Sequence, residues 1–234
     1  EVMARVSKGY TASPSDKALR NALSGTALNV LATNAENAAM IDTHFSDRVK
    51  TKGITDQKSS GRCWLFTGMN VLRAKMIDKY DLGAFTLSQN YLFFYDQLEK
   101  SNLFLQGVID TRQLPFEDRK VDWLFSNPLS DGGQFTGVSD LVMKYGIVPS
   151  EVMPETYSSN NTTQMATQLK NILRQGGLKL RAAYDASGVS SLSGKKAAAA
   201  EVKVNAELQQ IKESVLTDVY RVLALCLGVP PTEF

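Results

Sequence analysis

Residues 57–66 read QKSSGRCWLF, a short polar segment that runs directly into a Cys-Trp pair. From Cys63 onward apolar side chains recur every three or four residues, which predicts an amphipathic helix. These side chains are Leu65, Phe66, Met69, Leu72, Met76 and Ile77. We expect Ser59 or Ser60 to cap this helix with a hydroxyl group, and residues 81–83 (DLG) to end it. The stretch therefore predicts that Cys63 lies in the first turn of a helix.

This position makes Cys63 a candidate nucleophile. The partial positive charge of a helix N-terminus favours thiolate over thiol, and Arg62 adds a neighbouring cation. Gln57 carries an amide that, together with the backbone N–H of Cys63, would form an oxyanion hole for acyl transfer. The alternative is that Cys63 is a small buried side chain, as most free cysteines are. The spacing of Gln57, together with Gly61 and Trp64, favours the nucleophile.

The same stretch resembles the nucleophile segment of papain-like cysteine peptidases, in which Gln-x5-Cys-Trp recurs. Ser60 stands where secreted members carry a disulfide-forming cysteine, and Arg62 replaces a small residue. Both departures are typical of the intracellular bleomycin hydrolase (aminopeptidase C) branch. The resemblance implies an α+β papain-like fold, a Cys63 acyl-enzyme stabilised by Gln57, and a substrate-binding role for Trp64. It implies peptide substrates and neither a metal nor an organic cofactor.

A second segment with chemical content is Asp131-Gly132-Gly133. By itself it predicts a turn in which the glycines allow close approach of a ligand backbone. In papain-like enzymes a Gly-Gly segment at this place pairs with the substrate backbone and helps to wall the main specificity pocket. The resemblance therefore implies that Gly132 and Gly133 bind substrate.

Composition excludes several other classes of protein. The 234 residues are 43% apolar and 21% charged, as in ordinary globular proteins. A net charge of +2 with interspersed signs gives no electrostatic footprint for nucleic acid, and no apolar run approaches the roughly 18 residues that cross a membrane. Two cysteines exclude a disulfide framework and suit a reducing compartment, so we expect a cytoplasmic protein.

His44 is the only histidine, and a thiol nucleophile needs an imidazole partner. It precedes Cys63, whereas the catalytic histidine of papain-like enzymes follows the cysteine by more than about a hundred residues. We therefore expect His44 to be a surface or hydrogen-bonded structural residue. The resemblance implies that the catalytic histidine, and the asparagine that orients it, belong to a β-rich domain that this sequence does not contain.

The remaining segments predict further helices. Residues 87–100 are rich in aromatic side chains and indicate a core helix, with an aromatic ligand-binding stripe as the alternative. Residues 101–127 continue as helices with residues 123–125 (WLF) buried. A helix follows Thr162-Thr163, with Gly176-Gly177 breaking or bending it. Residues 187–196 are a linker, and residues 197–227 form one long helix that contains Cys226 as a packed thiol.

These elements predict three parts: a helical N-terminal extension (1–50) that packs on the peptidase body, a papain-like nucleophile domain (51–158), and an inserted helical hairpin leading toward the absent β-domain (159–234). The chain is then mainly the α-helical half of the fold, and by itself should be inactive. The resemblance implies that the hairpin assembles a homo-oligomer, a hexamer. An alternative is a non-catalytic assembly module that oligomerises through residues 162–227. A redox-sensing thiol at Cys63 would need a resolving partner, and Cys226 is distant in sequence.

Overall fold

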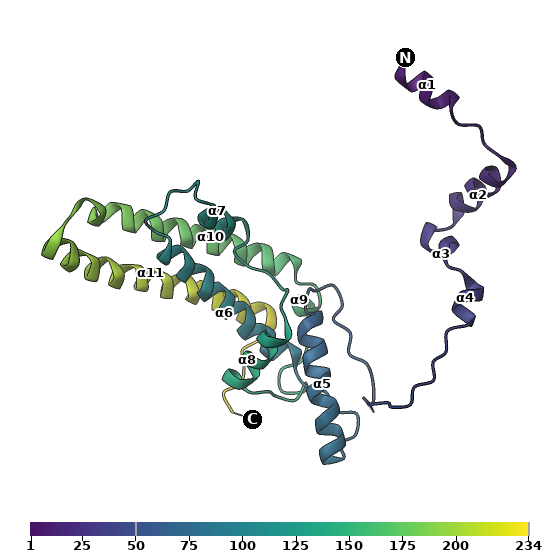
Figure 1. Ribbon diagram of the computed structural model, residues 1–234. Helices are drawn as coiled ribbons and strands as arrows, with labels where there is room; N and C mark the ends of the chain where they lie inside the picture. The colour runs from purple at the N-terminus through teal and green to yellow at the C-terminus, as the bar shows by residue number, and fades with distance from the viewer. Residues whose placement is uncertain (50, 234) are drawn as a thin grey trace. The chain divides into compact units, whose positions relative to one another are not determined.

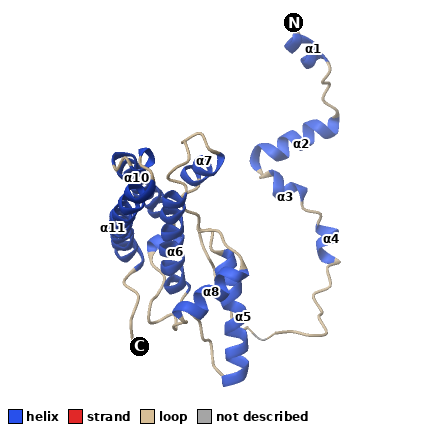
Figure 2. Ribbon diagram, turned by 60° about the vertical axis from the view of Figure 1, so that its left-hand side comes forward, coloured by secondary structure: helices blue, strands red, loops and turns tan. Residues whose placement is uncertain are grey.

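The computed structural model describes residues 1–49 and 51–233, and its regular elements are helices (Figures 1 and 2). The chain divides into two compact units, Glu1–Arg48 and Val49–Phe234. In the described residues no extended strand occurs, and two isolated bridges pair Ser59 with Asn161 and Leu87 with Pro149. No helix there combines the length and the hydropathy that crossing a membrane requires. The architecture agrees with the helical portion of the expected α+β fold.

The N-terminal unit contains four short helices, α1 (Val2–Lys8), α2 (Pro14–Gly25), α3 (Leu28–Ala32) and α4 (Ala35–Ala39). Helix α2 begins at a capping box, in which the Ser13 hydroxyl accepts from the backbone N–H of Asp16 and the Asp16 carboxylate accepts from that of Ser13. None of the residues of these helices is buried. The packing of this unit on a peptidase body stays a prediction.

The second unit contains the remaining helices, among them the longest ones. They are α5 (Cys63–Tyr80), α6 (Gln89–Asp110), α7 (Arg119–Ser126), α8 (Phe135–Tyr145), α9 (Tyr157–Asn160), α10 (Thr163–Ala186), the 3-10 turn η1 (Val189–Ser191) and α11 (Gly194–Leu227). Helices α6, α10 and α11 lie side by side as a bundle, and α5 and α8 pack on each other and on α6 (Figure 1). Helix α5, which begins at Cys63, thus rests on one end of a large helical core.

Helix α6 is the centre of this core. The Ser88 hydroxyl caps it by accepting from the backbone N–H of Tyr91. Its aromatic residues Tyr91, Phe93, Phe94 and Phe104 are buried in one apolar cluster. This burial confirms the interpretation of residues 87–100 as a core helix.

Helix α7 corrects the prediction for residues 123–125. Trp123 is 62% exposed, while Leu124 and Phe125 are half-buried. The helix has about two turns and turns its buried Val121 toward the core, which places Leu124 and Phe125 on the same side one turn later. Trp123 therefore falls on the opposite face, so the prediction that it is buried is wrong.

Helix α10 runs without interruption through Gly176 and Gly177, so of the two predicted outcomes the break is wrong, and the bend stays a prediction. A Cβ atom on Gly176 would lie 2.7 Å from Cγ1 of Val215 on α11. A Cβ atom on Gly177 would lie 3.0 Å from Cζ of Phe125 on α7. The two glycines let neighbouring helices approach α10 closely, and their role is packing.

Helices α10 and α11 form the predicted hairpin, joined by residues 187–193 with Gly188 at φ +61°. The buried row of α11 is apolar apart from one lysine, and consists of Val204, Leu208, Lys212, Val215, Val219, Leu223 and Leu227. Cys226 is half-buried at the edge of this row, so it packs against the core without being enclosed. The hairpin packs along α6, and its separation from residues 51–158 as a domain stays a prediction.

Candidate nucleophile site

Cys63 is the first residue of α5 and is exposed, which contradicts the alternative of a small buried side chain. The residue before the helix is Arg62, and no side chain caps the first turn. The expected serine cap is wrong because Ser60 is engaged elsewhere: its hydroxyl donates to the carbonyl of Gln57 and accepts from Nε of Arg62. The first amide groups of α5 are thus uncapped, and such a helix end attracts an anion.

The turn before Cys63 is closed by two hydrogen bonds between Gln57 and Ser60. Nε2 of Gln57 donates to the Ser60 carbonyl, and the Ser60 hydroxyl donates to the Gln57 carbonyl at 2.7 Å. Lys58 adopts φ +54° inside this turn. A carboxamide carries a second N–H, and it is this hydrogen that an oxyanion would use. The oxyanion role of Gln57 stays a prediction.

Arg62, the residue before Cys63, is completely buried. Its guanidinium donates to both carboxylate oxygens of Glu155, at 3.1 and 2.9 Å, and lies about 5 Å from the ring centres of Phe66 and Phe93. A bidentate pair in an apolar setting fixes both side chains. Arg62 is therefore a paired cation, and the main effect of its pairing is to fix the backbone directly before Cys63.

Two of the predicted substrate-binding residues, Trp64 and Gly133, lie against each other. A Cβ atom on Gly133 would lie 2.6 Å from Cδ2 and Cε2 of the indole ring. The Trp64 Nε1–H donates to the carbonyl of Asp131 at 2.7 Å. Only glycine at position 133 permits this approach, so the structure brings the Gly-Gly segment to the first turn of α5.

Asp131 is a connecting residue that the sequence did not reveal. Its Oδ2 accepts from the backbone N–H of Gly61 at 3.2 Å and from the hydroxyl of Thr162 at the start of α10. A Cβ atom added to Gly61 would lie only 2.8 Å from the Cβ atom of Asp131. Asp131 therefore joins the candidate nucleophile turn (residues 57–64), the Gly-Gly segment and the hairpin. An Asp before two glycines predicts only a turn, and these contacts lie 70 and 31 residues away.

Lys100 and Asp96 on α6 form a second group that the sequence did not reveal. The Lys100 ammonium donates to the Gly132 carbonyl at 2.7 Å and to Asp96 at 2.8 Å. Burial raises the pKa of Asp96 to about 6, although the hydrogen bonds from Lys100 and Gln97 act in the opposite direction. The Gly132 carbonyl is thus held, while Gly133 is exposed and has no hydrogen-bond partner among the described residues. Of the two glycines, Gly133 offers the freer backbone groups to a ligand.

His44 lies at the surface of the N-terminal unit, as expected. Its backbone N–H donates to the carboxylate of Asp42 at 2.8 Å.

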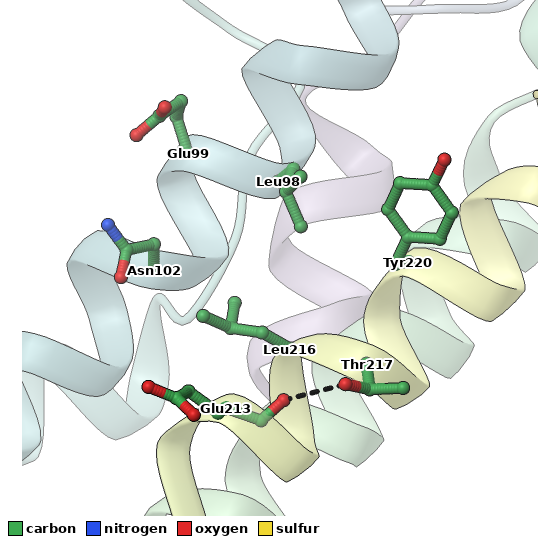
Figure 3. Close-up of a pocket in the computed structure, with 7 residues that line it drawn as sticks. All are labelled: Leu98, Glu99, Asn102, Glu213, Leu216, Thr217 and Tyr220. Atoms are coloured by element: carbon green, nitrogen blue, oxygen red, sulfur yellow. Dashed lines mark hydrogen bonds between the residues drawn. The ribbon is translucent and has the colours of Figure 1, made fainter. Parts of the chain in front are cut away.

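A separate cavity of about 580 Å³ lies between α6 and α11 (Figure 3). Its lining residues are Leu98, Glu99, Asn102, Glu213, Leu216, Thr217 and Tyr220. Glu99 accepts from Lys144 and Tyr145, and although burial acts to raise the pKa of Glu99, these hydrogen bonds lower it. The cavity contains none of the predicted site residues, so the candidate site is the one at Cys63.

Comparison with known proteins gives one family. A match to the Peptidase C1-like family covers residues 1–234. Aminopeptidase C of Lactobacillus delbrueckii subsp. lactis is 38% identical over 218 residues, 90% of this chain and 45% of that protein. Bleomycin hydrolase of Rattus norvegicus is 34% identical over 185 residues, 78% of this chain and 37% of that protein. The crystal structure of PepW from Lactobacillus rhamnosis HN001 matches with a TM-score of 0.83 and 35% identity, covering 99% of this chain and 49% of that one. The chain spans about half the length of these relatives or less.

Proposed function

Because the chain belongs to the Peptidase C1-like family, we propose that it is the nucleophile-bearing portion of a cysteine aminopeptidase. The observation that carries this proposal is the exposed Cys63 at the uncapped start of α5. The complete enzyme removes residues from the N-termini of peptides. Its substrate class follows from the aminopeptidase C and bleomycin hydrolase names of the relatives.

In this proposal the Cys63 thiolate attacks the carbonyl carbon of the first peptide bond. The oxyanion that forms accepts hydrogen bonds from the Cys63 backbone N–H and from the second amide N–H of Gln57. The amine leaves with a proton, and water then hydrolyses the thioester. Trp64, Gly132 and Gly133 bind the peptide beside the nucleophile.

The proton acceptor and donor is a histidine that we place outside these 234 residues. The only histidine here, His44, lies at the surface of the N-terminal unit. A thiolate without its imidazole partner can be alkylated, but it cannot protonate a leaving amine. This chain by itself is therefore inactive in turnover.

The complete enzyme is a cytoplasmic homo-oligomer, a hexamer, that assembles through residues 162–227. Exposed apolar side chains on α10 and α11, among them Leu178, Val202 and Leu225, support an interface on the hairpin. The same side chains favour the second candidate function, a non-catalytic assembly module. Sedimentation velocity tests both: a strict monomer over a wide concentration range would count against assembly through the hairpin.

The experiment that tests the activity uses the complete protein from its source, with its intact mass determined first. Hydrolysis of peptides with a free N-terminus is measured beside the same peptides N-acetylated, before and after iodoacetamide and, separately, a chelator. We expect activity on the free peptides that iodoacetamide abolishes and the chelator spares. Activity that survives alkylation but not chelation would overturn the proposal. A protein with the mass of these 234 residues alone and with no turnover would favour the assembly module over the enzyme.

A further inference from the structure

Lys100 is the point at which α6 meets the Gly-Gly segment. Its ammonium donates to the carbonyl of Gly132 at 2.7 Å, to that of Ser130 at 3.1 Å and to Oδ2 of Asp96 at 2.8 Å. An ammonium group has three hydrogens, so all of its donors are used. Lys100 is therefore a fixed side chain that clamps two carbonyl groups of the same loop.

Asp96 anchors this clamp from one turn earlier on α6. Its side chain is almost entirely buried, and the same Oδ2 accepts from Nε2 of Gln97 at 2.9 Å. Nε2 of Gln97 also reaches the Ser130 carbonyl, at 3.2 Å. Lys100 and Gln97 thus both donate to the carboxylate of Asp96 and to the carbonyl of Ser130. Because this carboxylate is buried and held by hydrogen bonds, it leaves little freedom to the Lys100 side chain that pairs with it.

The other side of the lysine faces the nucleophile helix. The Lys100 ammonium lies 5.2 Å from the centre of the Trp64 ring, a distance at which a cation is attracted to an indole face. Trp64 follows Cys63 in the first turn of α5 and lies against Gly133. One charged group therefore contacts both the Gly-Gly segment and the turn that carries the nucleophile.

We propose that Lys100, anchored by Asp96, is a positioning residue that holds the Gly132–Gly133 segment against the nucleophile turn and thereby sets the affinity for the peptide backbone. This role rests on the proposed function. Two adjacent glycines have wide conformational freedom, and Lys100 removes part of it by holding the Gly132 carbonyl. A peptide that pairs with Gly133 then pays less to order the segment. The sulfur of Cys63 is not touched by Lys100 in this scheme, so binding changes more than chemistry does.

The first test is steady-state kinetics of the complete protein with Lys100→Met, Lys100→Arg and Lys144→Met. Lys144 is a matched control, because it also pairs with a carboxylate of α6 (Glu99) and contacts an aromatic ring, but it makes no hydrogen bond to the Gly-Gly segment. We expect Lys100→Met to raise KM about tenfold, the equivalent of about 1.4 kcal/mol, with kcat changed less than about twofold. Lys100→Arg recovers most of the loss, and Lys144→Met leaves both constants unchanged. Unchanged KM in Lys100→Met would overturn the proposal.

A second test does not depend on turnover. In a Cys226→Ala background, Cys63 is labelled with a dipeptidyl chloromethyl ketone, which uses the backbone-binding segment, and with iodoacetamide, which does not. The ratio of the two rates falls about tenfold in Lys100→Met and stays constant in Lys144→Met. If Lys100→Met does not fold, Asp96→Asn removes the anchor and is read in the same way. An equal ratio in all variants would overturn the role of Lys100, whereas a wild-type protein without thiol-dependent activity would overturn the proposed function alone.

Discussion

The nucleophile turn (residues 57–64) and the bundle of α6, α10 and α11 are held together by different forces. The turn is held by polar contacts: Gln57 with Ser60, Arg62 with Glu155, and Gly61 with Asp131. The bundle is held by buried apolar side chains and by close approach at Gly176 and Gly177. The exposed polar contacts of the turn contribute little to stability but set geometry, the buried pair of Arg62 with Glu155 being the exception, while apolar burial contributes most of the stability. Changes in the turn should therefore act on activity, and changes in the bundle on folding.

The largest expected effect is on activity alone. Cys63→Ala in the complete protein should lower kcat by roughly 10⁵- to 10⁶-fold, because it removes the nucleophile. The free energy of unfolding should change by less than about 0.5 kcal/mol, since Cys63 is exposed. Peptide hydrolysis and urea denaturation measure the two quantities. Cys226→Ala is the matched control and should retain activity. Loss of activity in that variant alone would show that the reactive thiol is Cys226 on α11.

The next effect is on folding alone. Leu173 of α10 is completely buried, so Leu173→Ala should lower the free energy of unfolding by about 2–5 kcal/mol. Leu178→Ala, at a half-exposed position of the same helix, should cost about 0.5 kcal/mol or less. Urea denaturation followed by circular dichroism checks both values. The rate at which iodoacetamide alkylates Cys63 without denaturant should be the same in both variants, and a large difference would show that the two regions are coupled.

A smaller effect comes from the contact between α10 and α11. Gly176→Ala should destabilise the chain by about 1–3 kcal/mol, because the added methyl group would overlap the side chain of Val215. The double variant Gly176→Ala/Val215→Ala should be more stable than the sum of the single changes predicts. Denaturation of all four members of the cycle gives the coupling. Strict additivity would mean that α10 and α11 separate without cost at this point.

The smallest expected effect is a pH dependence of the free energy of unfolding. It arises from Asp96, which lies where the bundle contacts the nucleophile turn. Because the pKa of Asp96 is raised to about 6, the folded chain binds more protons than the unfolded chain just below that pH. This group therefore makes the fold more stable as pH falls, by about 1 kcal/mol between about pH 7 and pH 5. The charged groups that face Asp96 are Lys100 on its own helix and Asp131 in the loop.

Denaturation at the two pH values measures this dependence, and Asp96→Asn should abolish it. Glu99→Gln is the control on the same helix. The pKa of Glu99 is lowered, so Glu99 contributes stability that is lost only as pH falls toward and below its ordinary pKa. A wild-type stability difference that persists in Asp96→Asn would assign the effect to another group.

The sequence alone predicted the long helices and the start of α5, but it misjudged details that depend on neighbours. Periodicity over many residues determines which face of α6 or α11 is apolar, whatever the helix packs against. Trp123 was misjudged because its face of α7 points away from the core, and the pair Gly176-Gly177 because the side chains of neighbouring helices lie against it. A tryptophan is not buried merely by being apolar, and a glycine in a helix can serve a close contact instead of a break.

By itself, then, the sequence determined that Cys63 lies in the first turn of a helix, that a Gln lies six residues before it, and that a Gly-Gly segment follows at residues 132–133. These features are local, and their chemistry follows from residue type and spacing. Only the tertiary structure decided that Glu155 pairs with Arg62 across 93 residues, and that Lys100 holds the loop of Gly132 across 32. The physical reason is that a charged or hydrogen-bonding side chain has many possible partners along a chain. The packing of apolar helix faces selects the one that lies within reach.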